Sequence, residues 1–264
     1  MKGPDVSWEQ AARARAFDLV HRGTPGDVAF YRHVCAGAEA VLELGCGSGR
    51  ILVELARAGL AVTGLDLDAA RLERARAELQ REGCTGARLV HGDMTRLALG
   101  ERYDRVLIPY NALCALADDR AVLDCLRGAA RHLRPGGSVW FDVYAVEDSL
   151  MDEPHGDAGD EEELELILSA VDAQGRVDVW EREHQHADPR RIDLIYRYEL
   201  GGQAGEPTRA VDEIISHLLL PPVRLRALLA EAGLRIHQEY GDFDPAPLTE
   251  ESPAFIVGAQ REDA

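Results

Sequence analysis

The sequence predicts an α/β protein with a doubly wound, seven-stranded and mostly parallel sheet and an inserted antiparallel β lid. From residue 40 onward, short apolar runs alternate with amphipathic helical patterns, which is typical of parallel strands joined by crossover helices. Between residues 146 and 220 this alternation stops. Longer runs with a period of two follow one another there across short polar turns, as in an antiparallel meander.

The elements of the doubly wound part follow in order. Apolar runs predict strands at residues 40–44, 61–65, 87–90, 105–108 and 138–144, and helical periodicity between them predicts helices at 50–58, around Leu72 and Leu79, and at 120–133. Near the end of the chain, "PPVRLRALLAEAGL" begins with proline and ends at glycine, as a helix should. The runs 235–240 and 254–260 then complete the sheet as its antiparallel edge.

We therefore expect three parts: an N-terminal helical segment over residues 1–39, a core formed by 40–145 and 221–264, and the insertion at 146–220. Strand-like runs in the insertion cover residues 176–186, 191–200 and 209–220, after an acidic stretch from Glu147 to Glu165. Because the insertion follows the fifth strand, it should lie over the carboxyl ends of the parallel strands, where α/β proteins bind ligands. That position predicts a lid and a substrate wall.

Composition excludes several partners. The chain of 264 residues has a formal charge of −18, which would repel phosphate backbones and anionic lipid, so neither nucleic acid nor a membrane is expected as a partner. No apolar run reaches the roughly 18 to 20 residues that cross a bilayer, and we expect a cytoplasmic protein. Five scattered cysteines without a C-x-x-C pair predict reduced thiols and no metal site. The composition leaves open whether the protein forms a homodimer.

The stretch "VLELGCGSGR" carries the clearest chemistry. Gly45, Gly47 and Gly49 follow the first strand directly and precede a helix, and such a turn lets backbone N–H groups approach a ligand. The dinucleotide fingerprint G-x-G-x-x-G would require glycine at position 50, where this chain has Arg50. A nicotinamide-dependent oxidoreductase is therefore disfavoured, although a turn of purely structural use remains an alternative.

The pattern E-x-G-x-G-x-G, which starts at Glu43, resembles the first motif of class I S-adenosylmethionine-dependent methyltransferases. Further matches are "VTGLDLD" after the second strand, "HGDMTRL" after the third, "IPYN" after the fourth and "LRPGGSVWFDVY" leading into the fifth. The segment "FDLVHRGTPGDVAFY" is similar to the beginning of small-molecule members of the family. The resemblance implies a Rossmann-like fold and S-adenosyl-L-methionine as the cofactor, with S-adenosyl-L-homocysteine as the product.

The resemblance also implies the cofactor-binding residues. Asp66, at a carboxyl strand end, would accept hydrogen bonds from both ribose hydroxyls, and Asp93 and Met94 would contact the adenine. The full expected set is Phe17, Tyr31, Glu43, Gly45, Cys46, Gly47, Gly49, Asp66, Leu67, Asp93, Met94 and Pro109. Many relatives carry tyrosine at the position of Phe17, and Tyr31 is expected to compensate for the missing hydroxyl.

The reaction that the resemblance implies is an in-line displacement, in which the protein mainly aligns the nucleophile with the methyl group. Tyr110 and Asn111, in the loop expected beside the methyl group, are candidates to hold the acceptor, and His184 is a candidate proton acceptor from the lid. "IPYN" differs from the D/N-P-P-Y/F motif of DNA and protein amide methyltransferases. We therefore expect a nitrogen or oxygen of a small molecule as the acceptor, such as a secondary metabolite, an amino sugar or an amine; the alternative is an inactive cofactor-binding regulatory protein.

Overall fold

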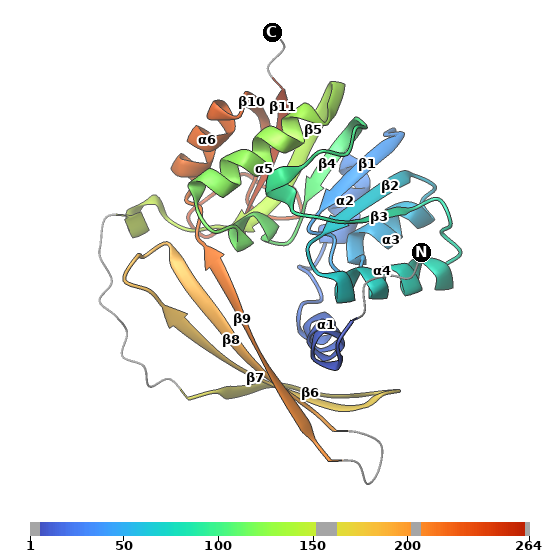
Figure 1. Cartoon of the computed structure of the whole chain (residues 1–264). Helices are drawn as coiled ribbons and strands as arrows, with labels where there is room; N and C mark the ends of the chain where they lie inside the picture. Colours follow the sequence, from blue (N-terminus) through green and yellow to red (C-terminus); the bar gives the residue numbers. More distant parts are fainter. Residues whose placement is uncertain (1–5, 152–162, 202–206, 262–264) are drawn as a thin grey trace.

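The computed structural model of the chain describes residues 6–151, 163–201 and 207–261. Its larger sheet has seven strands in the order β10-β11-β5-β4-β1-β2-β3 (Figure 1). The first five strands in the chain pair in parallel, and β11 runs antiparallel to both of its neighbours. The strands are β1 (Ala40–Leu44), β2 (Ala61–Asp66), β3 (Arg88–His91), β4 (Tyr103–Ile108), β5 (Leu133–Tyr144), β10 (Leu234–Tyr240) and β11 (Ala254–Arg261). The predicted doubly wound sheet is confirmed.

Helices cover both faces of this sheet (Figure 1). One face packs against α5 (Asp119–Arg131) and α6 (Pro222–Glu231), and the other packs against α2 (Asp27–Val34), α3 (Arg50–Arg57) and α4 (Ala69–Arg81). With both faces covered, the central strands carry unbroken apolar runs instead of alternating ones.

The last two strands complete the sheet as its antiparallel edge, as expected. β11 lies between β5 and β10. The run from Ala254 to Ala259 is buried at every position, as an inner strand requires, whereas β10 alternates less buried polar residues and suits an edge. Only β10 therefore forms the outer strand at this side.

The insertion contains a second sheet, the small sheet, which is an antiparallel meander in the order β6-β7-β8-β9. Its strands are β6 (Glu165–Asp172), β7 (Gly175–Gln185), β8 (Arg191–Leu200) and β9 (Arg209–Leu218). The sequence predicted three of these strands and missed β6, because "ELILSAVD" continues the acidic stretch. That stretch lies largely outside the described residues.

Helix α1 (Trp8–Val20) lies between the two sheets (Figure 1). Ala12 and Ala16 pack against Val177, Val179 and Tyr196 of the small sheet, and their short side chains permit close approach. Arg15 is 8% exposed and donates to the Asp172 carboxylate at 2.9 Å. The helix is thus bound to the small sheet by apolar contact and by a largely buried ion pair. Among the residues that the structure describes, no helix is long and apolar enough to cross a membrane.

Candidate active site

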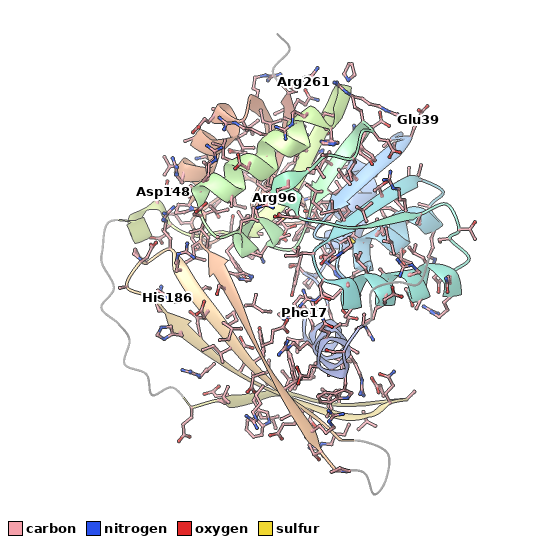
Figure 2. The ribbon with its side chains drawn as sticks, viewed as in Figure 1. Phe17, Glu39, Arg96, Asp148, His186 and Arg261 are labelled. Carbon is pink, nitrogen blue, oxygen red and sulfur yellow. The ribbon has the colours of Figure 1, made fainter. Side chains whose placement is uncertain are left out.

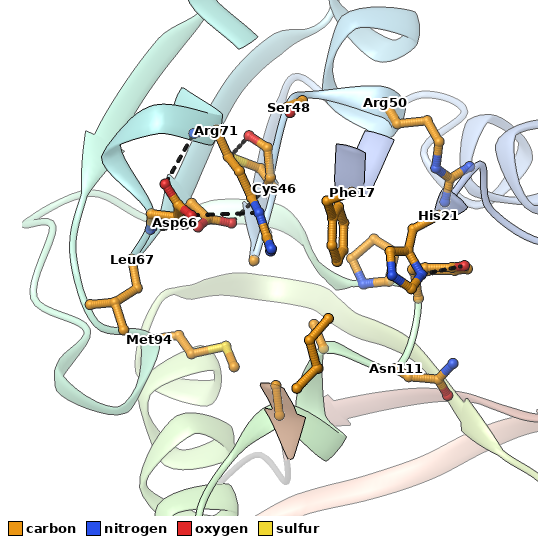
Figure 3. A pocket seen from close by; sticks show the side chains of 18 of the residues that line it. Phe17, His21, Cys46, Ser48, Arg50, Asp66, Leu67, Arg71, Met94 and Asn111 are labelled. Atoms are coloured by element: carbon orange, nitrogen blue, oxygen red, sulfur yellow. Dashed lines mark hydrogen bonds and ion pairs between the residues drawn. The ribbon is translucent and has the colours of Figure 1, made fainter. Parts of the chain in front are cut away.

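A cavity of about 1600 Å³ opens at the carboxyl ends of β1, β2 and β4. On its other side it is bounded by α1 and by residues 212–217 of β9 (Figure 3). Twelve of the residues predicted from the sequence line it, namely Phe17, Glu43, Gly45, Cys46, Gly47, Asp66, Leu67, Asp93, Met94, Pro109, Tyr110 and Asn111. Residues spread over much of the chain therefore meet around one space.

The glycine turn is shaped by its lack of side chains. Gly45 and Gly47 have φ angles of 70° and 51°, a left-handed conformation that residues with a Cβ adopt only with strain. The Gly45 N–H donates to the Leu65 carbonyl oxygen at 2.8 Å, which fixes the turn to the neighbouring strand. A Cβ on Gly47 would meet nothing within 4 Å. Bare backbone therefore faces the cavity at this position.

Asp66 lies where β2 ends, beside that turn. Its carboxylate accepts the Gly47 N–H at 2.6 Å and the Asp68 N–H at 2.8 Å. Burial raises the pKa of Asp66, while these two backbone hydrogen bonds act in the opposite direction. A carboxylate has about four lone-pair sites, so the two oxygens that are fixed in this way can still accept hydrogen bonds from ligand hydroxyls.

Leu67 and Met94 border the next part of the cavity (Figure 3). Leu67 is 70% exposed, so its side chain is available for contact with a ligand. Asp93 is the N-cap of η1 (Met94–Arg96), and one of its oxygens accepts the Thr95 N–H at 2.8 Å. The arrangement is an apolar surface for a flat ring, with a carboxylate beside it that can accept a hydrogen bond from an amino group.

The turn after β4 is strained. Tyr110 and Asn111 both have φ of 57°, which is uncommon for residues other than glycine and costs about 1–3 kcal/mol each. Asp142 of β5 holds the turn: its carboxylate accepts the Tyr110 N–H at 2.9 Å, and its backbone oxygen accepts the Asn111 N–H at 3.3 Å. Backbone strain of this kind concentrates at functional sites, and here it places Tyr110 and Asn111 on the cavity wall.

Comparison with known proteins identifies the family. Residues 41–137, which span the glycine turn and four strands of the large sheet, match the family model described as a methyltransferase domain. The cypemycin N-terminal methyltransferase of a Streptomyces species is 33% identical over 147 residues, which cover 54% of this chain and 58% of that protein. The chain carries the domain of an S-adenosylmethionine-dependent methyltransferase.

Two further relatives of this methyltransferase extend the comparison. The dTDP-3-amino-3,6-dideoxy-alpha-D-glucopyranose N,N-dimethyltransferase of Streptomyces fradiae is 32% identical over 141 residues, or 48% of this chain and 53% of that protein. The structure of S-adenosylmethionine-bound CalS10, an amino pentose methyltransferase from Micromonospora echinaspora, superposes with a TM-score of 0.67 at 20% identity. That superposition covers 97% of this chain and 99% of CalS10, and at this identity it supports the shared fold.

The methyltransferase has unpartnered polar atoms beside the glycine turn. Glu43 is 3% exposed, yet its Oε2 has no hydrogen-bond partner among the described residues, and the same is true of Ser48 Oγ. Burial raises the pKa of Glu43 to about 8, although Arg50 acts in the opposite direction. Both residues line the cavity beside the glycine turn. Together with Asp66 and Leu67 they fit a ligand that carries an ammonium group, a ribose and a flat ring.

Three predicted site residues lie outside the cavity lining. Tyr31 is fully buried beneath the site, where its hydroxyl donates to the Asp142 carboxylate. Gly49 is the N-cap of α3 with φ of 87°, and a Cβ there would come within 3.2 Å of Ala75. His184 pairs in register with Asp193 of β8, on the face of the small sheet opposite the one that packs on α1. Tyr31 and Gly49 therefore lie behind the residues that line the cavity. The sequence could not show which face of β7 is directed toward the cavity.

Sequence reasoning missed several residues of the cavity. Arg71 of α4 lies with its guanidinium 3.6 Å from the centre of the Phe17 ring and donates to Glu213 of β9 at 3.0 Å (Figure 3). Tyr144, where β5 ends, and His217 of β9 are 73 residues apart in the chain and meet at 3.1 Å. Arg71 and His217 belong to no motif, and Tyr144 ends the matched run "LRPGGSVWFDVY" without a role that the run predicts. The sequence held one signal for this region, an acidic residue within the apolar run "VWFDVY". That residue is Asp142, which supports the strained turn at Tyr110.

Proposed function

We propose that the methyltransferase acts on a nitrogen or oxygen of a small molecule. The single observation that carries this proposal is the second wall of the site: residues of α1 and β9 line the cavity on the side away from the glycine turn. A cavity bounded on two sides in this way is suited to a small acceptor rather than to a duplex or a folded protein surface. The formal charge of −18 also disfavours nucleic acid.

The names of the relatives support the same proposal. One acts on the N-terminus of cypemycin, one is a sugar N,N-dimethyltransferase and one is an amino pentose methyltransferase. All three names describe acceptors that bear an amino group. This chain covers only part of the first two proteins, so their acceptors are a guide to the panel that should be tested and not an assignment.

When bound, S-adenosylmethionine supplies a methyl group that its sulfonium already activates. The residues of the chain then have three tasks. Glu43, Gly47 and Asp66 would hold the cofactor in one orientation, the strained turn at Tyr110 and Asn111 would border the acceptor, and α1 with β9 would exclude water. Alignment of this kind can supply several kcal/mol of the barrier reduction, roughly 7 to 11 at the limit.

The test is transfer of radiolabelled methyl from S-adenosylmethionine to a panel of amino sugars, nucleotide-linked amino sugars, small amines, peptides with a free N-terminus and phenols. Labelled product with any member is expected, and the product's mass and fragmentation then show whether nitrogen or oxygen was methylated. Binding of S-adenosylhomocysteine without transfer to any member would instead favour a regulatory protein. The cytoplasmic location and a homodimer stay predictions, and light scattering would test the second.

A further inference from the structure

Two histidine–tyrosine pairs line the part of the cavity that the expected cofactor contacts leave free. His21, at the end of α1, lies with Nδ1 3.5 Å from the Tyr110 hydroxyl. His217 of β9 lies with Nδ1 3.1 Å from the Tyr144 hydroxyl. All four side chains line the cavity, and they come from four separate elements of the chain. Tyr144 also packs against the apolar core of the large sheet, and its hydroxyl extends from that core toward His217.

The two pairs have different electrostatic surroundings. The first pair lies near cations: the Arg50 guanidinium is 5.4 Å from the centre of the Tyr110 ring. Burial and then Arg71 lower the pKa of His21 to about 4. The pair of Tyr144 and His217 lies instead toward carboxylates of β7. Arg50 itself pairs with the Asp27 carboxylate at 2.7 Å. Burial with the charges of Asp27 and Asp142 raises the pKa of Tyr110 while Arg50 lowers it, so charges of both signs surround the first pair.

Glu181 and Glu183 of β7 provide the negative side. Burial is the first cause that raises the pKa of Tyr144, the neighbouring Cys114 and Tyr110 come next, and the charges of Glu183 and Glu181 raise it further. By strand alternation they share the face of Val177 and Val179, which packs toward α1. Burial lowers the pKa of His217, which keeps the imidazole uncharged near neutral pH.

We propose that Tyr144 and His217 form the acceptor subsite and that this subsite takes a primary or secondary amine, an inference that rests on the proposed methyl transfer. The hydrogen bond with Tyr144 uses Nδ1 of His217, so Nε2 is the nitrogen left to meet the acceptor. With Nδ1–H donating to the Tyr144 hydroxyl oxygen, the uncharged imidazole has no proton on Nε2, which can then accept an N–H of an amine, and the nearby carboxylates stabilise the ammonium form of that amine. A phenol gains nothing from those carboxylates, and an anionic acceptor is repelled by them.

Sinefungin provides a direct probe, because it carries an amine-bearing carbon where S-adenosylmethionine carries the methyl sulfonium. Its amine is directed toward the acceptor side, and S-adenosylhomocysteine is the matched ligand without that amine. Calorimetric titration of both ligands gives the ratio of the affinity for sinefungin to the affinity for S-adenosylhomocysteine. Contacts that both ligands make contribute equally to the two affinities, so a change in the ratio reports on the acceptor side. We expect the wild-type protein to bind sinefungin more tightly than S-adenosylhomocysteine.

His217→Leu should weaken sinefungin about tenfold and leave S-adenosylhomocysteine within about twofold, since a tenfold change is the ordinary effect of losing one good polar contact. Tyr144→Phe, which keeps the ring, should produce a smaller change of the same kind, and so should the double variant Glu181→Gln, Glu183→Gln. The control is His186→Leu: His186 pairs with Asp193 at 3.0 Å on the opposite face of the small sheet and lies far from Phe17 in Figure 2. It should change neither affinity.

The outcomes separate the two proposals. If the wild-type protein binds neither ligand, the proposed methyl transfer fails. If it binds S-adenosylhomocysteine but its affinity ratio is the same in the wild type, His217→Leu and Tyr144→Phe, the amine subsite is wrong and the proposed transfer stands. Circular dichroism and Tm show that each variant is folded, and Tyr144→Phe serves as the conservative test should His217→Leu unfold.

Discussion

The two halves of the cavity are built in different ways. The half at the glycine turn is formed by residues 43–67 and 93–94, which follow successive strands of one sheet, and much of its polar surface is backbone. The opposite half brings together Phe17, Tyr144 and His217 from three distant segments and consists of side chains. A half that binds through backbone requires particular residues at fixed spacings. A half that binds through side chains on strands can be built from many sequences.

Gly47→Ala should give the largest effect and tests the backbone half. The new Cβ projects into open space at the turn, where the ligand has to approach, and we expect the affinity for S-adenosylhomocysteine to fall about a hundredfold, or about 2.7 kcal/mol. Gly59→Ala is the matched control, since Gly59 also has a positive φ of 87° with nothing within 4 Å but does not line the cavity. Calorimetry should show normal binding for the control. Equal losses of affinity in both variants would point to backbone strain rather than to a contact between the ligand and the glycine turn.

Asp66→Ala should have the second largest effect on cofactor affinity. Loss of a charged acceptor for two ribose hydroxyls typically costs about 1.5–3 kcal/mol, so we expect affinity for S-adenosylhomocysteine to fall more than tenfold. Asp118→Ala is a suitable control, because Asp118 also accepts a backbone N–H, that of Ala121, at the start of α5 outside the cavity. Titration and thermal melting of both variants separate binding from stability. Unchanged affinity in Asp66→Ala would remove Asp66 from the cofactor site.

Tyr31→Phe distinguishes a residue that contacts the cofactor from one that supports the turn. Removing the hydroxyl leaves the buried Asp142 carboxylate short of one donor, so the free energy of unfolding should fall by about 1–3 kcal/mol. The affinity for S-adenosylhomocysteine should change less than about threefold. Urea unfolding and calorimetry measure the two effects. A tenfold loss of affinity at unchanged stability would restore the contact expected from the sequence.

Glu43→Gln should be seen in the pH dependence of stability. The folded-state pKa of Glu43, raised by burial to about 8, lies above the unfolded value of about 4.3, so the folded state keeps a proton that the unfolded state loses. Stability therefore falls as pH rises from about 4 to about 8, and glutamine, which does not titrate, abolishes this loss. The variant should gain several kcal/mol over the wild type at pH 8, since each pKa unit of the shift corresponds to about 1.4 kcal/mol, and little at pH 4. Tm values that run parallel from pH 4 to pH 8 would contradict the shifted pKa.

The sequence predicted much of the fold, and its errors have identifiable causes. Apolar runs located the five parallel strands because burial on both faces leaves few polar residues in them. β6 was missed since its alternating residues are largely exposed and follow an acidic stretch. The order of β10 and β11 at the edge was not predicted, because pairing order depends on which neighbours cover a strand, and periodicity does not report that.

The sequence alone determined the half of the site that rests on local geometry. Gly45 and Gly47, Asp66 and the pair Asp93–Met94 each follow a strand directly, so strand order brings them together whatever the rest of the chain does. Tertiary structure alone decided that Tyr31 lies beneath the strained turn, that His184 faces away from the cavity and that His217 meets Tyr144. In a strand, successive side chains point to opposite faces, and only the packing of α1 between the two sheets selects the face that meets the ligand.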